Sequence, residues 1–128
     1  MYTICKSFTF EASHKLKGLP KGHKCGRLHG HSYRVELIIA AANVDEHGFV
    51  VDYGDLRVFE DYLRDTLDHR HLNKLPQFKG IPTSAENIAR VLFNAITYAA
   101  PSVTWAGNLV AVRVYETART WAEYRRTP

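Results

Sequence analysis

A cysteine and a His-Gly-His triplet lie close together in the sequence, at Cys25, His29 and His31. Successive side chains of a β-strand point to opposite faces, so His29 and His31 are predicted to project to the same side. Two neutral imidazoles on one face can chelate one metal ion. A third His would complete the protein ligands of a catalytic zinc site and leave the fourth position open for water or substrate. Cys25 would then lie near the metal without having to be a ligand.

His14 is the candidate for the third imidazole. It lies near the end of a first strand that we expect over residues 2–16, where alternate residues are apolar. His14 falls on the apolar side of this alternation. Such a residue is either a buried, hydrogen-bonded core histidine or a metal ligand, and the histidine pair downstream favours the ligand.

Asp68, His69 and Glu116 are further candidates for chemistry. Asp68 and His69 are adjacent at the end of an expected helix, where a carboxylate can orient an imidazole for proton transfer. An ordinary helix terminus, at which a cationic His is favoured by the helix dipole, explains the same pair equally well. Glu116 continues the valine face of an expected late strand. It is either a solvent-facing strand end or an acceptor for a ligand that presents two adjacent N–H groups.

Strands and turns account for much of the chain that positions these residues. Residues 17–28 form a loop rich in Gly, Pro and Lys. This basic loop is either simply solvated or a positive rim that attracts a polyanionic substrate and stabilises a Cys25 thiolate. A second strand is expected from His29 to Ala41, and a short third strand over residues 49–51 is expected to pair back on it as a hairpin. A last hairpin begins after Gly107-Asn108.

Two helices are expected between these strands. Asp52 can cap the first, which runs from about residue 54 to 67. The second begins at a capping box in which Thr83 is the N-cap and Glu86 the third helical residue, and Pro101 lies just past its end. The order β, β, β, α, α, β, β predicts an α+β fold, with an antiparallel sheet and both helices on one face. Its open edges favour pairing between subunits.

Composition restricts the class of protein. The 128 residues are expected to form a single domain over 1–128, with 45% hydrophobic and 23% charged residues. No apolar run of about 18 residues and no signal-peptide pattern is present, so we expect no membrane partner. Two cysteines make no disulfide framework, which indicates a cytoplasmic protein. The formal charge of +4 favours an anionic partner, either nucleic acid or a small phosphorylated molecule.

Motifs along nearly the whole chain resemble the 6-pyruvoyltetrahydropterin synthase superfamily. They are Phe8-Thr9-Phe10-Glu11-Ala12-Ser13-His14, Cys25-x-x-x-His29-Gly30-His31, Leu67-Asp68-His69-x-x-Leu72-Asn73, Pro82-Thr83-Ser84 and Val114-Tyr115-Glu116-Thr117. The three residues between Cys25 and His29 are similar to the bacterial branch, the 6-carboxytetrahydropterin synthases of the queuosine pathway. Residues 118–124 match no motif of the family that we recognise.

The resemblance implies the tunnelling fold, in which antiparallel sheets with paired helices on one face assemble side by side into a β-barrel. It implies a homohexamer, built as a dimer of trimers, with active sites near subunit interfaces. The residues that it implies for the site are the zinc ligands His14, His29 and His31, the catalytic residues Cys25, Asp68 and His69, and the pterin anchor Glu116.

The activity that this resemblance implies is a Zn²⁺-dependent lyase reaction. A pterin triphosphate, 7,8-dihydroneopterin triphosphate, would be converted to 6-carboxy-5,6,7,8-tetrahydropterin with release of acetaldehyde and triphosphate. The alternative is the sister reaction, which eliminates triphosphate and makes 6-pyruvoyltetrahydropterin. A basic metal-binding module for nucleic acid fits the charge, but the sequence has no zinc framework of paired cysteines and no recognition helix, so we expect no nucleic-acid partner. An iron oxygenase would normally have two His and one carboxylate as ligands. The three-His interpretation leaves no such role for a carboxylate.

Overall fold

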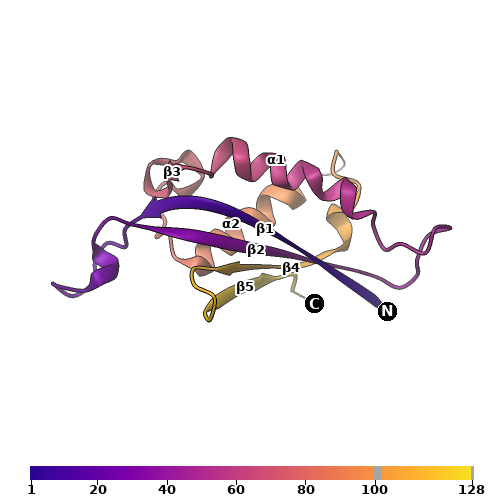
Figure 1. Cartoon of the computed structure of the whole chain (residues 1–128), viewed down its shortest axis with the longest axis horizontal. Helices are drawn as coiled ribbons and strands as arrows, with labels where there is room; N and C mark the ends of the chain where they lie inside the picture. The colour runs from indigo at the N-terminus through magenta and orange to yellow at the C-terminus, as the bar shows by residue number, and fades with distance from the viewer. Residues whose placement is uncertain (100–101, 128) are drawn as a thin grey trace.

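The computed structural model describes residues 1–99 and 102–127, which form one five-stranded sheet and two α-helices (Figure 1). The strands are β1 (Tyr2–His14), β2 (His29–Ala41), β3 (Arg70–His71), β4 (Leu109–Tyr115) and β5 (Trp121–Arg125). The helices are α1 (Arg57–Thr66) and α2 (Ala85–Tyr98). Short 3-10 turns occupy Lys24–Gly26, Tyr53–Leu56, Leu72–Lys74, Pro76–Phe78 and Ala106–Asn108.

The long antiparallel pair of β1 and β2 is the frame of the sheet. Its register is continuous from Tyr2 opposite Ala41 to His14 opposite His29. The strand order is β3-β1-β2-β4-β5, and only β3 runs parallel to its neighbour among the described strands. Because β1 ends where β2 begins, the basic loop lies at the same end of the sheet as the histidines.

One face of the sheet is apolar and carries both helices, as the alternation of residue types predicts (Figure 1). Residues of β1 and β2 that share a side, such as Phe10, Tyr33 and Val35, are buried together with Leu63 of α1 and Leu92 of α2. Burying a side chain of this size stabilises the fold by roughly 1.5–3 kcal/mol. The α+β class with two helices on one face is therefore confirmed.

The opposite face of the sheet carries charged and aromatic side chains. The Arg34 guanidinium lies 3.7 Å from the ring centre of Tyr115, whose hydroxyl donates a 2.8 Å hydrogen bond to Glu36. Arg113 contacts Glu123 at 2.7 Å. No described helix packs on this face. None of the described helices has the length and apolar character needed to cross a membrane.

The expected strand over residues 49–51 is wrong, because the structure has no strand there. β2 already pairs with β1 on one side and with β4 on the other, so it offers no free edge. The turn is closed instead by Asp45, whose carboxylate accepts the backbone N–H groups of His47 and Phe49, each at 2.9 Å. Pro101, expected just past the second helix, lies outside the described residues.

The N-cap of α2 also differs from the expectation. Ser84, not Thr83, caps the helix, and its hydroxyl accepts the backbone N–H of Asn87 at 3.3 Å. Two neighbouring hydroxyl residues precede the helix, and only one can be the N-cap. Glu86 therefore lies one position too early for a capping box and is exposed. Thr83 is fully buried and is used elsewhere.

Candidate metal centre

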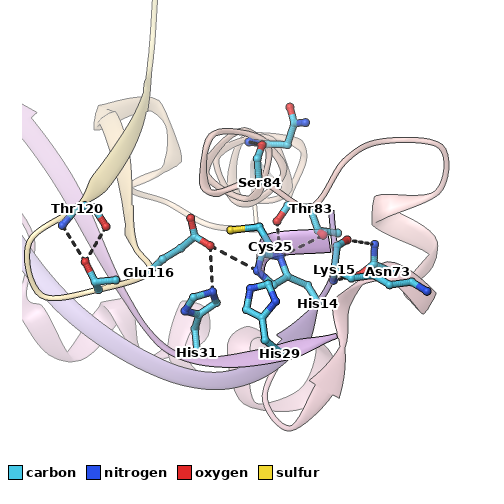
Figure 2. Close-up of polar contacts among 12 residues, drawn as sticks. His14, Lys15, Cys25, His29, His31, Asn73, Thr83, Ser84, Glu116 and Thr120 are labelled. Carbon is cyan, nitrogen blue, oxygen red and sulfur yellow. Dashed lines mark hydrogen bonds and ion pairs between the residues drawn. The ribbon is translucent and has the colours of Figure 1, made fainter. Parts of the chain in front are cut away.

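The structure brings His14, His29 and His31 together at the end of the β1–β2 pair. His14 and His29 face each other directly in the register, and His31 lies opposite Ala12. One ring nitrogen from each of the three histidines lies within 4.8 Å of those of the other two. Figure 2 shows the three imidazoles converging on one region. A triad of this kind can hold a divalent metal ion.

Hydrogen bonds fix the orientation of two of these rings. His14 is fully buried, and its Nδ1 lies 2.7 Å from the backbone oxygen of Thr83 and 3.2 Å from the Thr83 hydroxyl (Figure 2). Nδ1 of His29 lies 2.7 Å from the backbone oxygen of Arg27. A carbonyl oxygen can only accept, so each Nδ1 carries the proton, which leaves Nε2 with its lone pair. Metal-binding histidines typically have such a second hydrogen bond.

The free nitrogens of the site fit a metal ion. Among the described residues, Nε2 of His14 and Nε2 of His31 are buried and have no hydrogen-bond partner. Buried polar atoms without partners are rare in native structures, and a bound ion is one of their ordinary explanations. Burial lowers the pKa of His31, an effect that Glu116 opposes. A lowered pKa favours the neutral imidazole, which is the form that binds a metal.

Glu116 follows the end of β4 and faces the triad, so it is not a solvent-facing strand end. Its Oε2 lies 3.2 Å from Nε2 of His31 and 3.4 Å from Nε2 of His14 (Figure 2). The contact with the His14 side chain, followed by the charge of His31, holds the pKa of Glu116 below its ordinary value despite partial burial. On its other side Glu116 lines a cavity of about 150 Å³ with Glu86 and Thr120.

Cys25 lies in the 3-10 turn Lys24–Gly26, and its thiol is partly exposed. The turn is held by His23, whose Nδ1 accepts the backbone N–H of Cys25 at 3.1 Å. In the view of Figure 2 the Cys25 sulfur points toward the Glu116 carboxylate. Basic residues of the same loop, including Lys17 and Arg27, line a neighbouring cavity of about 370 Å³. The positive charges around this cavity can attract an anionic group.

Asp68 and His69 form a pair that is separate from the triad in this chain. Asp68 accepts the backbone N–H of Glu11 at 2.8 Å and lies 3.0 Å from Nδ1 of His69. The hydrogen bond from Glu11, and then the contact with His69, holds the pKa of Asp68 below its ordinary value. The His69 side chain is 78% exposed, and within the described residues it makes no hydrogen bond or ion pair with the triad or Cys25. His69 and His31 do line one open cavity of about 490 Å³.

Two supporting contacts were missed by sequence reasoning. Thr83 was assigned to helix capping, although its carbonyl and hydroxyl in fact hold the His14 ring. The Asn73 side chain makes two hydrogen bonds with the backbone of Lys15. It donates to the Lys15 carbonyl and accepts the Lys15 N–H, both at 2.9 Å. Both residues lie in the motifs quoted above, but no spacing rule predicts that they contact β1, because each contact joins segments distant in sequence.

Comparison with known proteins agrees with this fold. Residues 3–127 match the family described as 6-pyruvoyl tetrahydropterin synthase. A 6-carboxy-5,6,7,8-tetrahydropterin synthase of Synechocystis is 36% identical over 129 residues, covering 97% of this chain and 93% of the relative. The protein of that name in Haemophilus influenzae is 28% identical, covering 98% of this chain and 99% of the relative.

A solved structure gives the same result for the fold. The 6-pyruvoyl tetrahydropterin synthase of Caenorhabditis elegans superposes with a TM-score of 0.83 at 26% sequence identity, covering 98% of this chain and 96% of the other. The fold, the triad and the family match together define a pterin-synthase type of protein. The chain belongs to the 6-pyruvoyl tetrahydropterin synthase family.

Proposed function

We propose that this chain is a zinc-dependent lyase that makes 6-carboxy-5,6,7,8-tetrahydropterin from 7,8-dihydroneopterin triphosphate in queuosine biosynthesis. Mass balance requires one water on the substrate side and acetaldehyde and triphosphate as the other products. The observation that carries the proposal is the histidine triad, in which the Nε2 atoms of His14 and His31 are buried without a hydrogen-bond partner and lie against the Glu116 carboxylate. The names of the Synechocystis and Haemophilus influenzae relatives support the carboxy product.

The metal ion would be held by His14, His29 and His31. When bound, zinc supplies a Lewis acid that polarises substrate oxygens and makes the neighbouring C–H protons more acidic. The chain itself excludes water from part of this region, because His14 is fully buried and the Nε2 atoms of His14 and His31 are buried as well.

Proton transfers are assigned to Cys25 and His69. The Cys25 thiolate would move a proton of the substrate side chain, and His69 would supply or remove its partner proton. The Asp68 carboxylate would accept a hydrogen bond from the Nδ1–H group of a neutral His69 ring. This arrangement leaves Nε2 of His69 free for the proton transfer. Glu116 would accept the amino group and ring N–H of the pterin, a bidentate arrangement that only a carboxylate matches. The basic loop would attract the triphosphate.

We propose a cytoplasmic homohexamer, a dimer of trimers, with the whole chain as one domain and active sites near subunit interfaces. The exposure of His69 and its lack of contact with Cys25 support such a shared site. The uncovered, polar face of the sheet and its edges support assembly into a barrel.

The decisive experiment is incubation of the zinc-loaded protein with 7,8-dihydroneopterin triphosphate, followed by assay of acetaldehyde and of the pterin product. Acetaldehyde together with a 6-carboxy pterin is the expected result. The likeness to the Caenorhabditis elegans 6-pyruvoyl tetrahydropterin synthase favours a second candidate, triphosphate elimination alone with a 6-pyruvoyl product. That product without acetaldehyde would overturn the first proposal and keep the site. Absence of any reaction would overturn both.

A further inference from the structure

The contact of Glu116 with two histidines has the spacing of ligands on a common ion. Its Oε2 lies 3.2 Å from Nε2 of His31 and 3.4 Å from Nε2 of His14. In a tetrahedral site with metal–nitrogen bonds of roughly 2.0–2.1 Å, neighbouring donor atoms lie roughly 3.3–3.4 Å apart. The carboxylate oxygen therefore lies, relative to these two nitrogens, where a further ligand would lie.

An ordinary hydrogen bond from a neutral ring does not explain the contact of Glu116 with His14. The Nδ1 proton of His14 is engaged with the Thr83 carbonyl, so Nε2 of the neutral ring presents a lone pair to the carboxylate. Neither Nε2 atom makes a hydrogen bond with Glu116 or with any other described residue. The lone pair of His14 Nε2 and the carboxylate oxygen can both only accept, so they repel one another at this separation unless a cation lies between them. The alternative is an ion pair with a protonated imidazole.

The Glu116 side chain also borders a second environment. It is 29% exposed, and it borders the cavity of about 150 Å³ that Glu86 and Thr120 help to line. One carboxylate thus lies between the triad and the pocket in which a pterin would be recognised. A ligand that binds only the outward position must draw the carboxylate away from the inward one.

We propose that Glu116 is a fourth ligand of the bound metal while the pterin pocket is empty, and that a pterin releases it. The amino group and ring N–H of the ligand take over the carboxylate, so the coordination position opens only when a pterin is present. This keeps water and unrelated oxygen ligands from the metal between turnovers. The inference rests on the proposed metal and pterin binding, and it adds that the two compete for one side chain.

Cobalt(II) in place of zinc reports the coordination directly, because its visible d–d bands respond to ligand type and geometry. The test compares these bands, and the cobalt dissociation constant, in wild type and Glu116→Gln. We expect Glu116→Gln to change the bands and to weaken cobalt binding by about tenfold or more. Glu86→Gln is the matched control, since it removes the same charge from the same pocket but has no contact with the triad.

Titration with unsubstituted pterin is the second measurement. This probe has the amino and N–H edge but no side-chain oxygen that could bind the metal. We expect pterin to shift the cobalt bands of wild type towards those of Glu116→Gln, and to leave the bands of Glu116→Gln unchanged. Equilibrium dialysis of pterin against each protein establishes whether pterin binds.

The outcomes separate this inference from the proposed function. Cobalt and pterin binding with identical bands in wild type and Glu116→Gln would overturn the inference and leave the function standing. A thiolate charge-transfer band that disappears in Cys25→Ser would assign the fourth position to Cys25 and overturn it as well. Failure of wild type to bind cobalt or pterin at all would overturn both the inference and the proposed function.

Discussion

His69 has a left-handed backbone conformation, with φ of 59°, and no other described non-glycine residue has a positive φ. For an L-residue this conformation costs roughly 1–2 kcal/mol relative to glycine. Glycine loses roughly 0.5–1 kcal/mol more backbone entropy on folding than alanine does. His69→Gly is therefore expected to be more stable than His69→Ala by about 0.5–1 kcal/mol. Both variants lose the contact with Asp68, so this loss cancels in the comparison.

The assay is urea unfolding of both variants at equal protein concentration, with the midpoint and slope measured for each. Arg70 is the control position, because its φ is not positive. There the sign should reverse, with Arg70→Ala more stable than Arg70→Gly by about 0.5–1 kcal/mol. If His69→Ala equals or exceeds His69→Gly in stability, the left-handed conformation is not the one adopted in solution. Under the proposed function both His69 variants should also lack the proposed lyase activity, and that result would support a role of His69 in the chemistry.

Three further predictions concern the residues around the site. Asn73→Ala should lower the free energy of unfolding by about 1–3 kcal/mol in the same unfolding assay, because two hydrogen bonds to the Lys15 backbone are lost. Asn73→Asp keeps the acceptor for the Lys15 N–H but sets an oxygen against the Lys15 carbonyl, so it should not recover this loss. Mixing inactive Cys25→Ala and His69→Ala proteins, after dissociation and reassembly, should restore part of the lyase activity if sites are shared between subunits, whereas no recovery would place each site within one chain. The contribution of Asp68 to stability should be complete above pH 3.8 and be lost as the pH falls through its lowered pKa, so the unfolding curves of wild type and Asp68→Ala should converge at low pH.

The positions of the histidines were predictable because they depend on a strand period of two and on one pairing. His29 and His31 share a side by alternation alone, and His14 shares the apolar side of β1. The register that sets His14 opposite His29 is not in the local pattern. It results from the antiparallel pairing of β1 with β2 on either side of the basic loop. The resemblance to the family implied the three ligands together, but not this register.

The errors have a different physical origin. The stretch 49–51 has the residue types of a strand, but strand formation needs a free neighbouring edge, and β2 has none. Thr83 has the local chemistry of an N-cap, but Ser84 takes that place and the buried ring of His14 uses the Thr83 carbonyl and hydroxyl. In both cases a long-range contact overrides a local preference, and a single sequence carries no direct signal for it.

The side chains of the site differ in burial and in their hydrogen-bond partners, and these differences agree with the roles proposed for them. His14 is buried and locked by Thr83 at the end of a 13-residue strand pairing, which suits a ligand that must keep one position. His69 is exposed, strained and held through its neighbour Asp68, which suits a group that must gain and lose a proton. Glu116 lies between the two extremes, partly exposed and in contact with two environments. Since only a side chain with two accessible positions can couple metal and pterin binding, Glu116 is the residue at which such coupling is expected.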